Sequence, residues 1–204
     1  MERRDGWQLL TLVGRIFGVE LVLVDAEKGT YRQLSRACHF CRLVRGRREG
    51  YLLCELARRS AVRTVQEAEG PVADRCHAGL GYLGVPVGTG GVLLAGGLTV
   101  PWWEGPDPVK VARITGADQA VVLRHLAHLP VHTPALVRRL QSLMCGAART
   151  ITLQQDLAAQ NLRLLGAVRE AALLAVRGLV RALEAKDPYT FWRASSAWPT
   201  PTTP

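Results

Sequence analysis

The stretch RCHAGLGYLGVPVGTGGVLLAGG, residues 75–97, decides the fold class of this chain. It begins with a cysteine and a histidine side by side, Cys76 and His77, and continues as a glycine-punctuated run with hardly a charge. Its second half joins two apolar segments, 83–89 and 92–100, through a two-glycine connection. Glycine tolerates the positive φ that tight hairpin turns require, so this pattern predicts a β-hairpin. A phosphate-binding loop is excluded because no Gly-Lys-Ser/Thr follows and no helix opens there.

Around this hairpin the chain alternates short helical and extended patterns. Apolar spacing predicts a helix over 7–17, and a β-branched run closed by the turn-prone DAEKGT predicts a strand over 19–25. Residues 38–50 show no regular pattern. The remaining predicted elements are a helix over 48–68 ended by Gly70-Pro71, a strand over 71–78 that carries Cys76 and His77, a loop over 101–108, and helices over 108–114 and 117–128. In the 48–68 helix we expect Leu52 and Leu56 on the buried side, with Val62 or Val65.

From Pro134 to residue 186 the sequence predicts one long helical stretch with no further proline. A narrow apolar stripe repeats along it at steps of three and four: Leu165, Val168, Ala172, Val176, Leu179 and Leu183. Such a stripe is typical of a helix that pairs with a copy of itself or packs on a neighbour. Residues 187–204 have no periodicity and are rich in Pro, Ser and Thr, so we expect them to be disordered.

The composition is that of a folded globular chain. Of 204 residues, 48% are hydrophobic and 21% are charged, and no apolar run is long enough for a transmembrane helix. The N-terminal pattern is not that of a signal peptide, so we expect a cytoplasmic protein. The net charge is +9, but the basic residues are scattered without interleaved aromatics, which argues against nucleic-acid binding.

Four of the five cysteines fall within 39 residues: Cys38, Cys41, Cys54 and Cys76. A Cys-x-x-Cys pair, here Cys38 and Cys41, is a common metal-binding element, and Cys54, Cys76 and His77 are further candidate ligands. The spacing fits no common zinc-finger pattern, so a metal or iron–sulfur site, buried structural cysteines and reactive redox thiols stay open as alternatives.

The other histidines and the fifth cysteine indicate no further site. His125, His128 and His132 are spaced by three and four, but Pro130 interrupts them, so we expect surface or packing roles. Cys145 lies in a helical pattern and is expected to be a packed residue. Neither a Ser-His-Asp order nor paired carboxylates nor a nucleotide fingerprint is found, so the sequence does not indicate an enzyme.

Several of these motifs, in their order, resemble the PocR sensory domain. They are FCRLVR at 40–45, then Cys54, then PVADRCHAGLGYLGVPV at 71–87 and GGVLLAGGLTV at 90–100, and the resemblance covers about residues 5–130. It implies an α/β fold with a PAS- or GAF-like antiparallel sheet and flanking helices, which senses small hydrocarbon derivatives such as diols. By position, the family's cysteine and histidine pattern falls on Cys41, Cys54, Cys76 and His77, whereas Cys38 is less typical of it.

A second, shorter resemblance lies near the C-terminus. ALEAKDPYT, residues 182–190, resembles the opening of an HD-GYP phosphodiesterase domain, but FWRASSAWPTPTTP, residues 191–204, departs from that family's pattern. We therefore expect 187–204 to be the remnant of an HD-GYP start, left by a frameshift or an early stop, without phosphodiesterase chemistry.

The sequence as a whole predicts a sensory domain over 5–130 followed by a signalling helix over 134–186 that forms a homodimer. The expected partner is a small organic ligand, and the candidate ligand-binding residues are Cys76, His77, Gly79, Leu80 and Pro86. Two alternatives are a metal or iron–sulfur redox sensor built on the cysteine cluster, and a structural interaction protein whose long helix recruits a partner.

Overall fold

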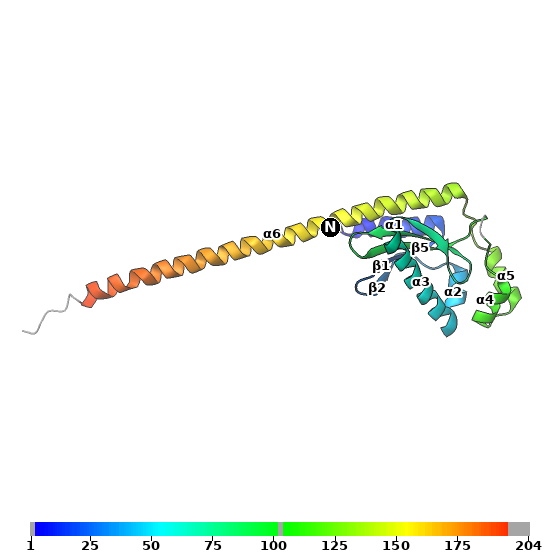
Figure 1. The fold of residues 1–204 in the computed structure, drawn as a ribbon, viewed down its shortest axis with the longest axis horizontal. Helices are drawn as coiled ribbons and strands as arrows, with labels where there is room; N and C mark the ends of the chain where they lie inside the picture. The colour runs from blue at the N-terminus through cyan, green and yellow to red at the C-terminus, as the bar shows by residue number, and fades with distance from the viewer. Residues whose placement is uncertain (1–2, 102–103, 196–204) are drawn as a thin grey trace, which may run out of the picture. The chain divides into compact units, whose positions relative to one another are not determined.

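The computed structural model describes the backbone of residues 3–101 and 104–195 and the side chains of 8–101 and 104–183. The chain divides after Gln154 into two compact units. The first unit holds a mixed α/β domain, and the second consists of the continuation of the last helix (Figure 1). The predicted fold class is confirmed.

The elements follow one another along the chain as a helix, a β-hairpin, two helices, three strands and three helices. Their bounds are α1 Arg3–Phe17, β1 Glu20–Asp25, β2 Thr30–Gln33, α2 His39–Arg45, α3 Arg48–Ala68, β3 Val72–Arg75, β4 Gly81–Val87, β5 Gly91–Leu98, α4 Pro108–Thr115, α5 Gln119–Ala127 and α6 Pro134–Ser195.

In the described residues the strands form one antiparallel sheet of five, in the order β2-β1-β5-β4-β3. The predicted hairpin is β4–β5, in which Val87 pairs with Gly91. Its turn is therefore Gly88-Thr89-Gly90, one residue longer than the predicted two-glycine turn. The positive φ values lie at Gly88 (55°) and Gly90 (76°), while Gly91 already belongs to β5.

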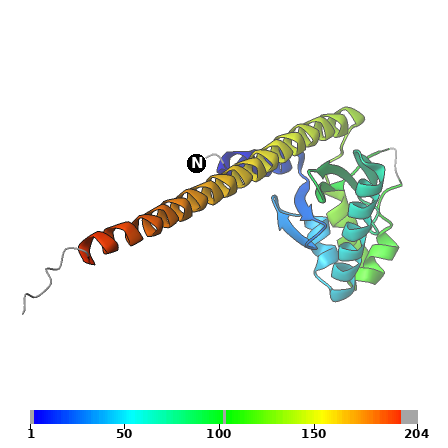
Figure 2. The same cartoon turned by 60° about the vertical axis from the view of Figure 1, so that its left-hand side comes forward.

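Helices cover both faces of the sheet. Alternate strand residues point to opposite faces and so contribute to two separate cores. Leu21, Leu83 and Leu93 share a core with α1 and the first turns of α6, whereas Val22 and Leu94 share another with α3. Figures 1 and 2 both show α1 and the start of α6 side by side. Leu140, Met144 and Ala148 of α6 are fully or almost fully buried in the first core. The first unit thus extends to Gln154, beyond the predicted domain end at 130.

Three local predictions were wrong. Residues 39–45, expected to be irregular, form α2, whose N-cap is Cys38. Leu52 and Leu56, expected to be buried, are 52% and 61% exposed, whereas Val62 and Val65 are buried as expected, together with Ala61. Cys76 and His77 do not lie in a strand: β3 ends at Arg75 and β4 begins at Gly81.

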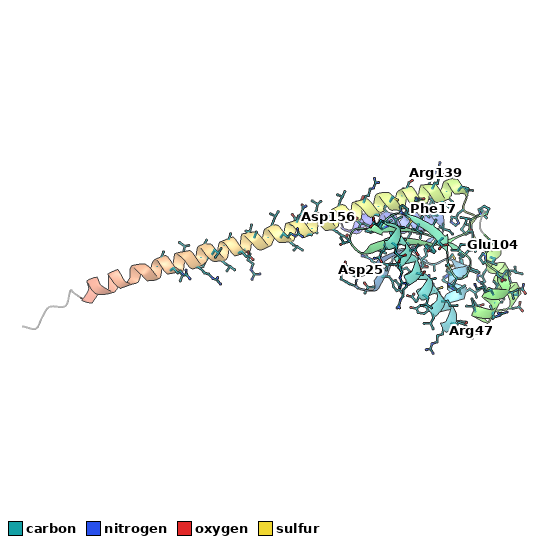
Figure 3. The ribbon with its side chains drawn as sticks, in the orientation of Figure 1. Phe17, Asp25, Arg47, Glu104, Arg139 and Asp156 are labelled. Carbon is teal, nitrogen blue, oxygen red and sulfur yellow. The ribbon has the colours of Figure 1, made fainter. Side chains whose placement is uncertain are left out.

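The second unit, which begins at Gln155, is the rest of α6. The helix continues past residue 186 to Ser195, so part of the tail that was expected to be disordered is helical, and residues 196–204 lie outside the described part of the chain. Asp156 marks the start of this unit in Figure 3. Its stripe residues are largely exposed, from 56% at Val176 to 68% at Leu183 for the leucines and valines. Over the described residues, no helix has the length and apolar character needed to cross a membrane.

Candidate functional site

A tight turn places the Cys76-His77 pair at the edge of the sheet. The Cys76 amide donates to the Leu80 carbonyl at 2.8 Å, and the Gly79 amide donates to the Cys76 carbonyl at 2.9 Å. Gly79 has a φ of 83°, and a Cβ there would lie 2.7 Å from the Cα of Pro106. Only glycine satisfies both constraints, so the turn requires the glycine of the Cys-His-Ala-Gly-Leu motif.

The turn borders a pocket between the sheet, α2 and α3. The pocket has a volume of about 670 Å³, including the part that is open to solvent. Most of its walls are apolar, and the polar groups are few. The lining residues are Glu20, Val22, Phe40, Cys41, Val44, Arg45, Cys54, Ala57, Arg58, Ala61, Cys76, His77, Ala78, Leu80, Gly81, Tyr82, Leu94, Gly96 and Gly97. Apolar walls with a few convergent polar groups are typical of a site for a small organic ligand.

The structure brings together most of the residues predicted for the site. Cys41, Cys54, Cys76, His77 and Leu80 all line this pocket. The sulfur of Cys38 lies behind one wall, 3.5 Å from the position of a Cβ on Gly97, a lining residue.

Two predicted ligand-binding residues are not among the lining residues. Gly79 shapes the turn and borders a separate hollow next to Pro106. Pro86 lies near the other end of β4, beside Glu69 and Arg149.

A buried ion pair at the pocket was missed by the sequence reasoning. Arg45 of α2 donates to both carboxylate oxygens of Glu20 on β1, at 2.7 and 2.5 Å. The Glu20 side chain is only 5% exposed. Burial works against the charge of Arg45, but bonding to Glu20 outweighs it and raises the Arg45 pKa. The sequence feature that could have predicted this pair is the lone glutamate in the apolar strand VELVLVD, since a buried carboxylate needs a partner.

Two buried nitrogens of the pocket residues have no hydrogen-bond partner within normal distance among the described residues: Nδ1 of His77 and Nε of Arg45. The Arg45 guanidinium nevertheless interacts with the thiol of Cys54. On the other side of the His77 ring, Nε2 lies 4.0 Å from the sulfur of Cys54. Burial, with the nearby charges of Lys110 and Arg45, lowers the pKa of His77. His77 is therefore neutral at pH 7, with one ring nitrogen as donor and the other as acceptor.

The cysteines of the cluster differ in ionisation. Burial raises the pKa of both Cys54 and Cys76, so they are thiols at neutral pH. Hydrogen bonding from the Cys41 thiol lowers the pKa of Cys38 to about 7. Among the described residues, no three or more His, Cys, Asp or Glu side chains are grouped so that they could hold a metal ion. A metal or iron–sulfur site on Cys38, Cys41, Cys54, Cys76 and His77 stays a prediction from the sequence.

Comparison with known proteins identifies the domain. The sequence model of one family, described as the sensory domain found in PocR, matches residues 8–156. The match takes in the turn, the pocket and the beginning of α6. The search of curated proteins and the search of solved structures each found no match.

Proposed function

Because the chain belongs to the family of the sensory domain found in PocR, we propose that it senses a small, uncharged organic molecule with at least one hydroxyl or carbonyl oxygen. The ligand occupies the pocket lined by Cys41, Cys54, Cys76 and His77. Its presence is passed to α6, which pairs with the α6 of a second copy.

The observation that carries this proposal is the buried, unpartnered Nδ1 of His77 in a largely apolar pocket. A buried polar group without a partner costs about 1–3 kcal/mol, so a ligand oxygen that bonds this nitrogen gains that energy back. The apolar walls, such as Phe40 and Leu80, accept the hydrocarbon part of the same molecule.

The charges of the site favour a neutral ligand. The carboxylate of Glu20 already neutralises Arg45 through two hydrogen bonds, Arg58 is paired with Glu55 at 2.6 Å, and His77 is neutral. A carboxylate or an ammonium would lose its hydration in this pocket without gaining a new counter-charge.

Strand β5 connects the pocket to α6 within the first unit. Leu94 and Gly96 line the pocket, and the intervening Ala95 shares a core on the opposite face with Leu140 and Met144 of α6. Thr152 of α6 also accepts a hydrogen bond from the Gly88 amide, in the β4–β5 turn, at 2.8 Å. A ligand that binds one packing of β5 more tightly shifts the population of α6 arrangements toward that packing.

The dimer is proposed from the stripe on the second unit. Leu165, Val168, Leu179 and Leu183 are each about two-thirds exposed, and no described residue covers them. Their spacing by three and four is that of a helix that buries an apolar seam against a copy of itself.

A thermal-shift titration with 1,2-propanediol and related small alcohols tests the proposal. We expect the unfolding midpoint to rise with ligand concentration, and the rise to be absent in Gly96→Val, which fills the pocket. Gly146→Val is the matched control, because neither glycine has an atom within 4 Å of its Cβ position but Gly146 lies away from the pocket. An equal response of both variants, or no response of the wild type to any small alcohol, diol, aldehyde or ketone, overturns the proposal.

His77→Leu separates ligand binding from structure. Removing an unpartnered buried nitrogen should leave the free energy of unfolding unchanged or higher, while the shift caused by the diol is lost. If stability falls by more than about 1 kcal/mol, His77 holds the fold together instead of awaiting a ligand.

A further inference from the structure

Two thiols stand in the wall between the ligand pocket and a second hollow. Cys41 lines the pocket, and Cys38, its neighbour three residues earlier, lines the hollow on the other side. Their sulfurs lie 3.8 and 3.5 Å from the same point, the Cβ position of Gly97. The Cys41 amide donates to the Cys38 sulfur at 3.3 Å. Both cysteines are free thiols in the structure.

The second hollow, which we name the basic cleft, lies between the end of α1, the 33–39 segment and the end of α5. It measures about 1640 Å³, including the part open to solvent. Its ionisable lining side chains other than Cys38 are all basic: Arg15, Arg36, His39, His125 and His128. No acidic residue is among those lining the cleft, and all of them belong to the described part of the chain. Cys38 is thus approached through a cleft whose two arginines, Arg15 and Arg36, are both positively charged.

From this placement we infer that Cys38 and Cys41 form a redox-active dithiol that exchanges with low-molecular-weight disulfides bearing carboxylates, which reach Cys38 through the basic cleft. The basic side chains attract the carboxylates of such a disulfide. The inference does not rest on the proposed ligand, because it concerns the other side of the wall.

The pKa values of the two thiols agree with their placement, because Cys38 ionises more readily than Cys41. The hydrogen bond from the Cys41 thiol lowers the pKa of Cys38 to about 7, against burial and the nearby Glu20 carboxylate. The same hydrogen bond, burial and the charges of Cys38 and Cys76 raise the pKa of Cys41. Cys38 lines the cleft through which the disulfide arrives, and Cys41 lines the pocket on the other side, so Cys38 attacks first, as a thiolate, and Cys41 second.

The exchange balances in two steps. The Cys38 thiolate, its proton lost to water, attacks one sulfur of the disulfide, forms a mixed disulfide and expels the other half, which takes up a proton. The Cys41 thiol then loses its proton, and its sulfur attacks the Cys38 sulfur, closing the Cys38–Cys41 disulfide and releasing the second half as a thiol. Two protein thiols are oxidised by two electrons, and one small disulfide is reduced to two thiols.

Little movement is needed to close this bond. Side chains three apart at a helix start have Cβ atoms about 5–6 Å apart, and a disulfide needs about 3.5–4.5 Å. Closing it draws Cys41 toward Cys38 and so alters the pocket wall to which Cys41 contributes.

The test uses the full, reduced chain, shown to be metal-free by elemental analysis, incubated without air with glutathione disulfide. Free thiols are then alkylated, and disulfides are mapped by peptide mass spectrometry. We expect a Cys38–Cys41 disulfide, with Cys54, Cys76 and Cys145 alkylated. A disulfide between Cys54 and Cys76 instead, or full alkylation of all five cysteines, overturns the inference without the need of any variant.

Variants then resolve the two steps. Cys41→Ser should keep one glutathione on Cys38, because no second thiol displaces it, and Cys38→Ser should form neither the adduct nor the disulfide. Cys145→Ser, remote in the core with α6, should react like the wild type. Circular dichroism checks that each variant folds, and a Cys41→Ser protein that is folded but carries no adduct on Cys38 contradicts the first step.

The basic cleft has its own test. Arg36→Gln should slow the reaction with glutathione disulfide about twofold at low salt, as expected for one charge removed near a solvent-exposed path. Its reaction with the neutral hydroxyethyl disulfide should keep the wild-type rate. Equal slowing of both reagents would show that Arg36 acts on the structure and not on the charge of the reagent.

Discussion

Gly84 and Gly96 lie on the same face of the sheet but meet very different surroundings. A Cβ on Gly84 would lie 2.3 Å from Cγ2 of Val65 and 3.0 Å from Cδ2 of Leu94, whereas a Cβ on Gly96 would have no atom within 4 Å. Gly84 packs against α3, where Val65 is fully buried, and Gly96 lines the pocket. Neither residue has a positive φ, so alanine is compatible with both backbones. The same substitution therefore has opposite effects at the two sites.

Gly84→Ala should lower the free energy of unfolding by about 1–3 kcal/mol, because the stiff, buried Val65 and its helix must move to admit the methyl group. Gly96→Ala should raise it by about 0.4–1 kcal/mol, through the smaller entropy of the unfolded chain. The two variants thus differ by roughly 1.5–4 kcal/mol.

Urea unfolding followed by circular dichroism measures both free energies. The comparison is valid where the slope of free energy against urea concentration is the same in the variant and the wild type. Loss of stability in Gly96→Ala by as much as in Gly84→Ala would refute the reasoning, since it would mean that the space above Gly96 is filled.

Three further predictions follow from the ion pair, the apolar stripe and the Cys38 thiol. Arg45→Met should lower the free energy of unfolding by about 3–5 kcal/mol, because it leaves the buried Glu20 carboxylate without its counter-charge, although Gln33 still donates a hydrogen bond to it. The Glu20→Gln/Arg45→Met double variant should recover most of the loss in the same urea assay, and no recovery would contradict the pairing. Leu165→Asp should give a monomer in analytical ultracentrifugation under conditions in which the wild type is a dimer, with the unfolding of the first unit unchanged; a dimer that persists would exclude the seam. Alkylation of Cys38 by iodoacetamide should increase with pH, half-maximal near pH 7, because the thiolate reacts; in Cys41→Ala the midpoint should move to higher pH, and an unmoved midpoint would show that Cys41 does not stabilise the thiolate.

The sequence reasoning reached the sheet and its hairpin because these depend on local patterns. The apolar segments on either side of the glycines specify two strands and a turn, and only the length of the turn, set by the φ values of Gly88 and Gly90, was missed. The prediction of the buried face was less accurate for α3, because the helical spacing of Leu52 and Leu56 is equally compatible with an exposed face.

The site was predictable to the extent that it lies in one motif. Cys76, His77 and Leu80 come from one turn, which the Cys-His-Ala-Gly-Leu pattern indicates directly. The partnership of Glu20 with Arg45 joins residues 25 positions apart on different elements, and no local pattern specifies which arginine of RLVRGRR bonds the buried carboxylate.

The division of Cys38 and Cys41 between two hollows could not be read from the sequence either. It depends on how α2 packs against β5, at the point where Gly97 lets both sulfurs approach the backbone. A Cys-x-x-Cys spacing is the same for a metal site, a dithiol and a packed pair, so the surroundings decide among them.

The most direct test of the account is the NMR signal of the His77 ring during a titration with 1,2-propanediol. In reduced protein with ¹⁵N-labelled histidine, the account predicts a saturable shift of the ring nitrogens of His77 at a stoichiometry of one, with His77 neutral at pH 7. The exposed His39 should not shift, and in Gly96→Val the His77 shift should disappear. An unchanged His77 ring throughout titrations with small alcohols, diols, aldehydes and ketones would contradict the claim that this pocket binds a small oxygenated molecule.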